Sequence, residues 1–192
     1  MKELQDRILA EGRVLPGNII KVDGFLNHRI DMALTRNMAR ELAGHFRGKG
    51  VTMVMTVEAS GIALASAAAE ELGVPLLFAK KAKSDNIEGG LVSSEIYSYT
   101  YKKKVTLIIS AEWLTASDRV LVVDDFLANG EAIRGLVEIV RKVGAEVVGV
   151  GIAVEKGFQG GGDHLREKGI DVKSLAIIDK AEPGHIEFRE NA

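Results

Sequence analysis

The sequence predicts an α/β fold with a central, mainly parallel sheet flanked by helices. Short and almost continuously apolar runs lie at 52–57, 120–123 and 147–154. The first two are followed by turns and then by helical patterns at 62–72 and 131–143. Strands that are apolar on both faces and alternate with helices are typical of a parallel sheet covered on both sides.

Length and composition indicate one domain and exclude several classes of function. The chain has 192 residues, of which 46% are hydrophobic and 27% charged, so we expect residues 1–192 to form a single domain with a full core. Its 25 Lys and Arg against 27 Asp and Glu leave a net charge of -2, which argues against nucleic acid as the main ligand. The absence of cysteine excludes disulfides, thiolate metal sites and a Cys nucleophile.

The N-terminal segment and the histidines add two further expectations. The first residues alternate charged and apolar side chains, and no later stretch approaches the roughly 18 apolar residues that a membrane span needs. We therefore expect a soluble, cytoplasmic protein that does not bind a membrane. The four histidines are widely spaced and form no metal-binding motif, and we name no residue as a metal ligand.

Two helices are predicted before the first apolar strand. Leu4, Ile8 and Leu9 share one face of a short helix, and Gly12 follows as the permissive residue on which helices commonly stop. A longer amphipathic helix is predicted from Asp31, which suits the N-cap. Its apolar residues recur at every fourth position: Leu34, Met38, Leu42 and Phe46.

Two regions interrupt the alternation of strand and helix. A polar loop at 80–90 is followed by mixed segments at 94–101 and 105–110, which indicate an antiparallel excursion from the parallel sheet. The chain then ends with two short strand candidates, 173–178 and 185–188.

The turn after the apolar run at 120–123 is the strongest candidate for a functional site. Asp124 and Asp125 follow the run directly, and Gly130 stands at the mouth of the next helix. A helix N-terminus suits a phosphate, and glycine allows the backbone to approach it closely. Two carboxylates there suit the hydroxyls of an attached sugar or a metal carried with it. The alternative is that the acids cap a turn and the glycine relieves backbone strain.

The same segment, VLVVDDFLANGEA, resembles the binding motif for 5-phosphoribosyl 1-diphosphate (PRPP) in purine phosphoribosyltransferases, with Asn129 where the general motif has Thr or Ser. Within it, the segment DDFLANG resembles the corresponding segment of the xanthine phosphoribosyltransferases. The resemblance covers nearly the whole chain through five segments in order: KVDGFLNHRID, TVEASGIALA, AKKAKS, VVDDFLANGEA and IAVEKGFQGG.

This resemblance implies a type I phosphoribosyltransferase-like fold with a small hood over the base, formed by about residues 1–30 and the C-terminal strands. It implies that Asp124 and Asp125 face the ribose hydroxyls and act in catalysis. It also places residues 58–61 at the pyrophosphate, with the Glu58 side chain turned away or joined to magnesium through water. The residues implied for the PRPP 5'-phosphate are Ala128, Asn129, Gly130, Glu131 and Ala132.

For the purine, the resemblance implies contacts from Ile20, Asn27 and Lys156, with Phe158 stacking on the ring. Without the resemblance, Asn27 reads as a turn former, Lys156 as a surface lysine and Phe158 as a core residue. The cluster Lys80, Lys81 and Lys83 begins the polar loop and has two interpretations of equal weight. It is either a loop that closes over the pyrophosphate or a solvated run of charge.

The function implied is transfer of phosphoribosyl from PRPP to xanthine, giving xanthosine 5'-monophosphate and pyrophosphate in purine salvage. Mg²⁺ carried with PRPP and a homodimer are implied as well. One alternative is a phosphoribosyltransferase for adenine, guanine or hypoxanthine. The other is a non-catalytic regulator that senses PRPP, as some purine repressors do, although the near-neutral charge argues against DNA.

Overall fold

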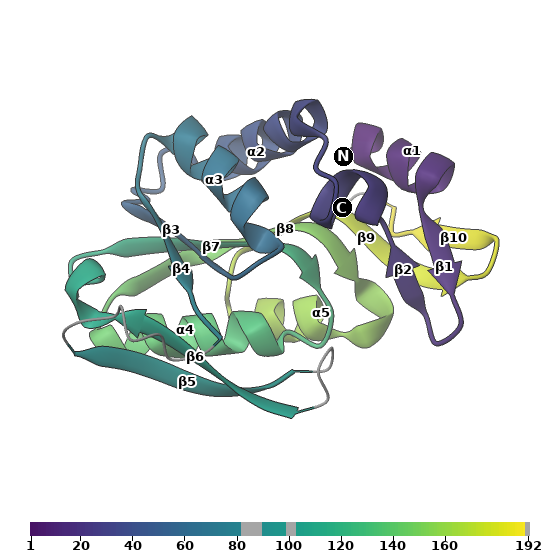
Figure 1. Cartoon of the computed structure of the whole chain (residues 1–192). Coiled ribbons are helices and arrows are strands. Elements are labelled where there is room, and N and C mark those ends of the chain that lie inside the picture. The colour runs from purple at the N-terminus through teal and green to yellow at the C-terminus, as the bar shows by residue number, and fades with distance from the viewer. Residues whose placement is uncertain (82–89, 99–102, 191–192) are drawn as a thin grey trace.

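The computed structural model describes residues 1–81, 90–98 and 103–190. In these residues a six-stranded sheet has the order β10-β9-β8-β7-β3-β4 (Figure 1). Strands β9, β8, β7, β3 and β4 run parallel to one another, and the edge strand β10 pairs antiparallel with β9. The predicted α/β class with a mainly parallel sheet is therefore confirmed. The strands are β3 (Met53–Val57), β4 (Leu76–Ala79), β7 (Arg119–Leu127), β8 (Glu146–Lys156), β9 (Val172–Glu182) and β10 (His185–Phe188).

Helices cover both faces of this sheet, and the central strand β7 shows why. Leu121 and Val123 belong to one core cluster, whereas Val120 and Val122 belong to a second cluster on the opposite face. Figure 1 shows α1, α2 and α3 above the sheet and α4 and α5 below it. The helices are α1 (Lys2–Glu11), α2 (Met32–Phe46), α3 (Gly61–Leu72), α4 (Glu131–Val143) and α5 (Gly161–Glu167). An apolar run such as 120–123 is therefore the signature of a strand buried on both sides.

The first two helices largely follow the sequence pattern. Asp31 is the N-cap of α2, where its Oδ1 accepts hydrogen bonds from the backbone N–H of Ala33 and Leu34 at 3.0 and 3.2 Å. The four apolar residues of α2 that the sequence pattern predicted to face the core are buried. In α1, Leu4 and Ile8 are buried, but Leu9 is 57% exposed, so the expectation that it shares their face was wrong.

The predicted antiparallel excursion is a hairpin of β5 (Leu91–Ser98) and β6 (Lys103–Ser110), separate from the main sheet. It packs against α4, where Lys142 Nζ donates to the backbone oxygen of Ser93 at 2.8 Å. Its link to the main sheet is a bridge between Lys80, just after β4, and Ile108. A 3₁₀ turn, η2 (Ala111–Trp113), leads from β6 towards β7.

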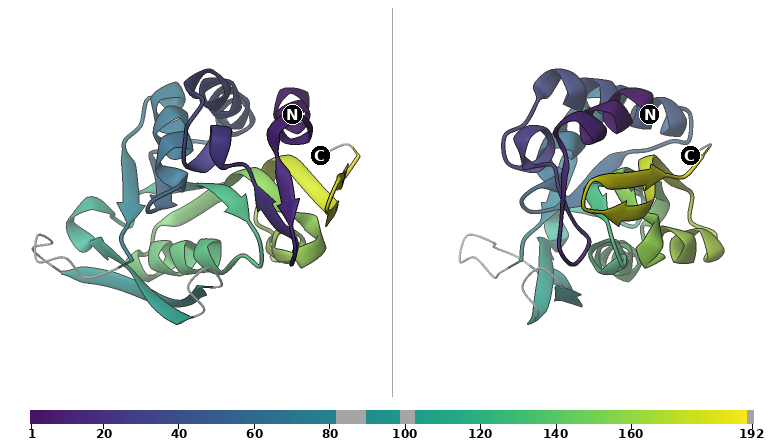
Figure 2. Two further views of the ribbon diagram at one scale, coloured as in Figure 1. Left: turned by 45° about the vertical axis from the view of Figure 1, so that its right-hand side comes forward. Right: turned by 90° about the vertical axis from the view of Figure 1, so that its right-hand side faces the viewer.

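The N-terminal segment also forms β1 (Arg13–Leu15), β2 (Ile19–Lys21) and a helical turn, η1 (Asp23–Asn27). The sequence did not predict the β1–β2 hairpin. Figure 2 shows this hairpin beside the C-terminal strands β9 and β10, at the end of the sheet where the hood was expected. No helix in the described part of the chain is long and apolar enough to cross a membrane.

Candidate active site

A pocket of about 430 Å³ opens at the carboxyl ends of β3, β7 and β8, where ligands bind in open parallel sheets. It is lined by residues from the hood, from the turn after β3 and from the start of α4. Ten residues for which a substrate or catalytic role was expected lie in its wall: Ile20, Asn27, Asp124, Asp125, Ala128, Asn129, Gly130, Glu131, Ala132 and Lys156.

Asp125 joins three parts of the site. Ser60 Oγ, from the turn after β3, donates to Asp125 Oδ1 at 2.9 Å, and Asn27 Nδ2, from η1, donates to Asp125 Oδ2 at 3.1 Å. Ser60 stands at the N-cap of α3 but makes no capping bond there. Its hydroxyl is directed to the carboxylate instead, so both oxygens of Asp125 are fixed by hydrogen bonds.

Asp124 is buried, as Asp125 is. Its Oδ1 accepts the backbone N–H of Asp125 at 3.0 Å, and burial, followed by the negative charge of Asp125, raises the pKa of Asp124 well above 3.8. The first residue of α3, Gly61, allows the close approach to this acid. A Cβ at Gly61 would lie 2.5 Å from Asp124 Oδ1 and would also overlap the buried Thr56 hydroxyl.

Residues 128–130 form a tight loop between β7 and α4. Gly130 has a φ of 83°, in the left-handed region that favours glycine, and α4 begins at the next residue. The first N–H groups of a helix have no partner within the helix, and residues 128–133 line the pocket, so this helix start suits a phosphate. Glu131 is directed to other partners, because its Oε2 accepts from Arg134 at 2.9 Å and from the Tyr97 N–H at 3.2 Å. The Arg134 hydrogen bond lowers the pKa of Glu131.

The start of α5 supports this loop from behind. A Cβ at Gly161 would lie 2.7 Å from the carbonyl carbon of Asn129 and 2.8 Å from the backbone nitrogen of Gly130. These atoms belong to the backbone and cannot rotate away. The loop and the first turn of α5 are therefore in direct backbone contact.

The turn after β3 is connected to the segment after β4 by a hydrogen bond between Glu58 and Lys81. Glu58 Oε1 accepts the backbone N–H of Lys81 at 2.8 Å, which accounts for an acid at the expected pyrophosphate turn. Lys81 lines the pocket, whereas Lys80 pairs with β6. Lys83 falls outside the described residues, and with it the expectation of a closing loop.

Lys156 ends β8 and reaches the pocket over the ring of Phe126, with its Nζ 5.7 Å from the ring centroid. Burial lowers the pKa of Lys156. Ile20 is buried in the same wall. Phe158, expected to stack on the purine, instead packs against the core and is not among the described residues that line the pocket.

Sequence reasoning missed Phe126 and Tyr97, which also line the pocket. Phe126 had a usable signal, because side chains two apart on a strand share a face and Phe126 is two residues from Asp124. Tyr97 had none, because its place depends on how the β5–β6 hairpin packs. Among the residues that the structure describes, no group of three or more His, Asp or Glu side chains could hold a metal ion.

Comparison with known proteins agrees with this geometry. Residues 22–185 match the family model described as phosphoribosyl transferase domain. A xanthine phosphoribosyltransferase from Bifidobacterium adolescentis is 52% identical over 192 residues, which covers 98% of this chain and 100% of that protein. One from Heliobacterium modesticaldum is 53% identical over 188 residues, with the same coverage.

Solved structures match the fold. An adenine phosphoribosyltransferase from Rhodothermus marinus has a TM-score of 0.72 at 19% identity and covers 92% of this chain and 99% of its own. An adenine phosphoribosyl transferase from Trypanosoma brucei, in complex with AMP, pyrophosphate and ribose-5-phosphate, has a TM-score of 0.73 at 19% identity. That match covers 91% of this chain and 79% of the other. These matches confirm the type I phosphoribosyltransferase-like fold expected from the sequence.

Proposed function

The chain belongs to the phosphoribosyl transferase family, and from this premise we infer that it is a xanthine phosphoribosyltransferase. In the reaction, a ring nitrogen of xanthine attacks the anomeric carbon of PRPP as pyrophosphate leaves, giving xanthosine 5'-monophosphate. One observation carries the proposal. A single pocket unites the paired acids after β7, the loop at the start of α4 and a half-buried lysine at the end of β8. The full-length similarity to xanthine phosphoribosyltransferases supports the choice of base.

The phosphate and the ribose take the β7–α4 side of the pocket. We assign the 5'-phosphate to residues 128–132, because the helix start offers backbone N–H donors and a partial positive charge. Asp124 and Asp125 then lie beside the ribose hydroxyls. The departing pyrophosphate leaves positive charge on the sugar, as in glycoside cleavage, and the two carboxylates stabilise it electrostatically. No covalent nucleophile is required.

Magnesium enters this proposal as part of the substrate, bound to the diphosphate of PRPP. Because no group of three acids among the described residues could hold a metal ion, the phosphate oxygens would supply most of its ligands, with Glu58, Asp124 and Asp125 in the pocket wall as further oxygen ligands. When bound, the ion neutralises charge on the leaving pyrophosphate. The turn at 58–61 and Lys81 are assigned to the same group.

We assign the purine to the part of the pocket that is lined by the end of β8 and by the N-terminal segment of the hood. Lys156 donates to a carbonyl of xanthine from a partly desolvated position, where an unpaired partner is costly. Asn27 Nδ2 donates one of its two hydrogens to Asp125, which leaves its second hydrogen and its Oδ1 for the edge of the purine. Ile20 supplies the apolar wall.

The same proposal makes residues 1–192 one catalytic unit. It includes a homodimer, as the family resemblance implies, which light scattering on the purified protein can test. PRPP and the nucleotide product carry several charges and do not cross a bilayer unaided, so the enzyme works in the cytoplasm.

A turnover assay with four bases tests the function. Purified protein, PRPP and Mg²⁺ are mixed with xanthine, guanine, hypoxanthine or adenine, and nucleotide and pyrophosphate are measured together. We expect the highest kcat/KM for xanthine. A higher value for another purine would reject the base assignment but leave the transferase intact, and no pyrophosphate release with any base would reject catalysis.

A further inference from the structure

Lys156 is a base-binding residue whose own side chain does little to fix its position. Among the described residues, no carboxylate forms an ion pair with its ammonium group, which lies over the face of the Phe126 ring. Its place in the pocket therefore depends on the backbone that carries it. That backbone runs from Glu155, the preceding residue, to Gly157, the first residue of the 3₁₀ turn η3 (Gly157–Gln159).

Glu155 is anchored in the interior. Its side chain is fully buried, and its two oxygens accept from Arg166 Nη1 and Nη2 at 2.9 and 2.7 Å. Ser174 Oγ donates to the same carboxylate. A bidentate guanidinium fixes the orientation of a carboxylate as well as its position. The residue before Lys156 is thus held in one geometry.

Gly157 is held by a second ion pair. A Cβ there would overlap Asp179 Oδ1 and would lie 3.0 Å from Arg189 Nη2. Arg189 itself donates to Asp179 from Nε at 3.1 Å and from Nη2 at 2.8 Å. Lys156 pairs with Ile178, the residue before Asp179, in the β8–β9 register. The backbone after Lys156 therefore rests directly on the Asp179–Arg189 pair.

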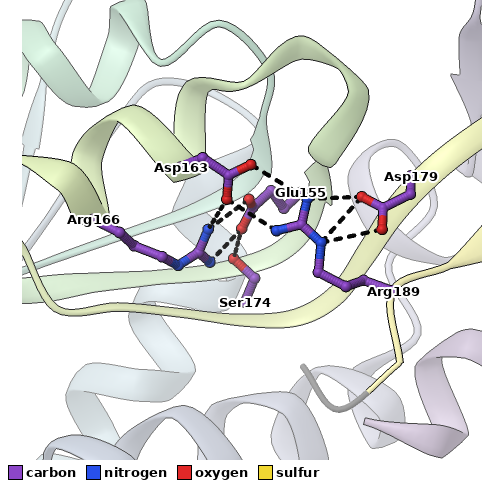
Figure 3. Close-up of polar contacts among 6 residues, drawn as sticks. All are labelled: Glu155, Asp163, Arg166, Ser174, Asp179 and Arg189. Carbon is purple, nitrogen blue, oxygen red and sulfur yellow. Dashed lines mark hydrogen bonds and ion pairs between the residues drawn. The ribbon is translucent and has the colours of Figure 1, made fainter.

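Asp163 in α5 connects the two ion pairs. It accepts from Arg166 Nη1 at 3.2 Å and from Arg189 Nη1 at 2.9 Å. Figure 3 shows the continuous arrangement, with the guanidinium groups of Arg166 and Arg189 on either side of the Asp163 carboxylate. We call it the polar chain, and its members are Glu155, Arg166, Asp163, Arg189 and Asp179.

We propose that the polar chain positions Lys156 for the purine, and that Arg189 is the positioning residue through which the C-terminal segment sets base affinity. The proposal rests on the proposed function. Both chain neighbours of Lys156 touch the polar chain, so loosening one link lets the lysine shift without removing any group that touches the substrate. A shift of this kind weakens the base more than PRPP.

The exposure of each side chain in the polar chain decides which residue can be replaced without unfolding the protein. Glu155 is a poor target, because breaking a buried ion pair leaves an uncompensated charge and destabilises the fold. The side chains of Arg189 and Asp163 are 33% and 46% exposed, so their replacement is expected to leave the protein folded. Arg40, which lies near Glu71 on the α2–α3 surface, provides a matched control.

The experiment measures KM for xanthine and for PRPP, with circular dichroism as a check on folding, in the wild type, Arg189→Gln and Arg40→Gln. We expect Arg189→Gln to raise KM for xanthine about fivefold or more while KM for PRPP changes by less than about twofold. Arg40→Gln changes neither. Asp163→Asn should act in the same direction, and it decides the matter if Arg189→Gln does not fold.

A double-mutant cycle with Lys156→Ala separates positioning from general stability. If Arg189 acts through Lys156, Arg189→Gln adds less than about twofold to KM for xanthine in the Lys156→Ala background. An unchanged KM for xanthine, equal losses for both substrates, or a full effect without Lys156 would each overturn the proposal. If the wild type prefers another purine, the same variants are tested with KM for that base in place of KM for xanthine. A wrong base assignment is thereby distinguished from a failure of the positioning proposal.

Discussion

Replacing Gly161 with alanine should distort the loop at 128–130, to which we assign the phosphate, without replacing any residue that lines the pocket. The new methyl group meets the backbone of residues 128–130, not the end of a flexible side chain. The loop or the first turn of α5 must therefore move, because neither can relieve the overlap by rotating a bond. The expected result is weaker binding of PRPP with little change for the free base.

The size of the effect follows from the distances. The Cβ would stand 2.2 Å from the backbone oxygen of Ala128 and 2.7 and 2.8 Å from two further backbone atoms, whereas ordinary contact begins at 3.4 Å. The backbone must separate by about 1.2 Å, the difference between 3.4 and 2.2 Å, which exceeds the roughly 0.5 Å tolerance of a preorganised site. A misplacement of about 1 Å costs up to about 100-fold. We therefore expect KM for PRPP to rise about tenfold, equivalent to about 1.4 kcal/mol.

The assay is a titration of PRPP and of xanthine against wild type, Gly161→Ala and Gly44→Ala. Gly44 is an exposed glycine in α2 with open space around its Cα, so alanine there should leave both affinities unchanged and stabilise the helix slightly. A folded Gly161→Ala protein with wild-type affinity for PRPP would refute the reasoning, and equal loss for both ligands would point to general misfolding.

Three further outcomes are expected. Lys156→Ala should raise KM for xanthine by about tenfold and narrow its advantage over guanine in competition kinetics, because one desolvated hydrogen bond is lost; an unchanged preference would contradict the role. The double variant Asp124→Asn with Asp125→Asn should lower kcat by at least about tenfold while remaining folded; wild-type turnover would exclude the acids from catalysis. Asp124→Asn alone should raise the thermal midpoint near pH 7. The pKa of Asp124 is higher in the folded protein than the value of 3.8 expected in the unfolded chain. Between the unfolded and the folded pKa the folded protein therefore binds more protons, so the stability of the wild type falls as pH rises through this range. Melting curves should show the gain shrinking towards zero below pH 3.8, and a gain independent of pH would contradict this account.

Local signals in the sequence predicted much of the fold and the acids and glycine of the pocket, whereas Ile20, Asn27 and Lys156 were predicted only by the family resemblance. The apolar run at 120–123, the acids after it and Gly130 lie within one short segment, so their pattern can be recognised without knowing the tertiary structure. The same holds for α2, whose cap and buried face lie within one segment. These predictions succeeded because burial on both faces and helix capping are properties of short stretches.

What the sequence left open depends on contacts between distant segments. The β1–β2 hairpin has strands of three residues each, too short for an alternating pattern. Leu9 fits a helical face by spacing, yet the core around α1 extends only over Leu4 and Ile8. The sequence around Arg166 and Arg189 is typical of surface charges. Nothing near them in the sequence indicates that Arg166 forms an ion pair with the buried Glu155.

In the site that we propose, Asp125 serves the sugar, and in the free protein its oxygens already accept from Asn27 of the proposed base site and from Ser60 of the turn after β3. A ribose hydroxyl that donates to Asp125 would use one of the remaining lone pairs of this carboxylate, because its two oxygens together offer about four acceptor sites. The added donor draws on the same negative charge and weakens the hydrogen bond to Asn27, and so changes the surroundings of a proposed purine ligand. Thermodynamic linkage then requires the purine to alter the affinity for PRPP by the same factor. On this assignment a single carboxylate couples the two substrates, whichever of them binds first.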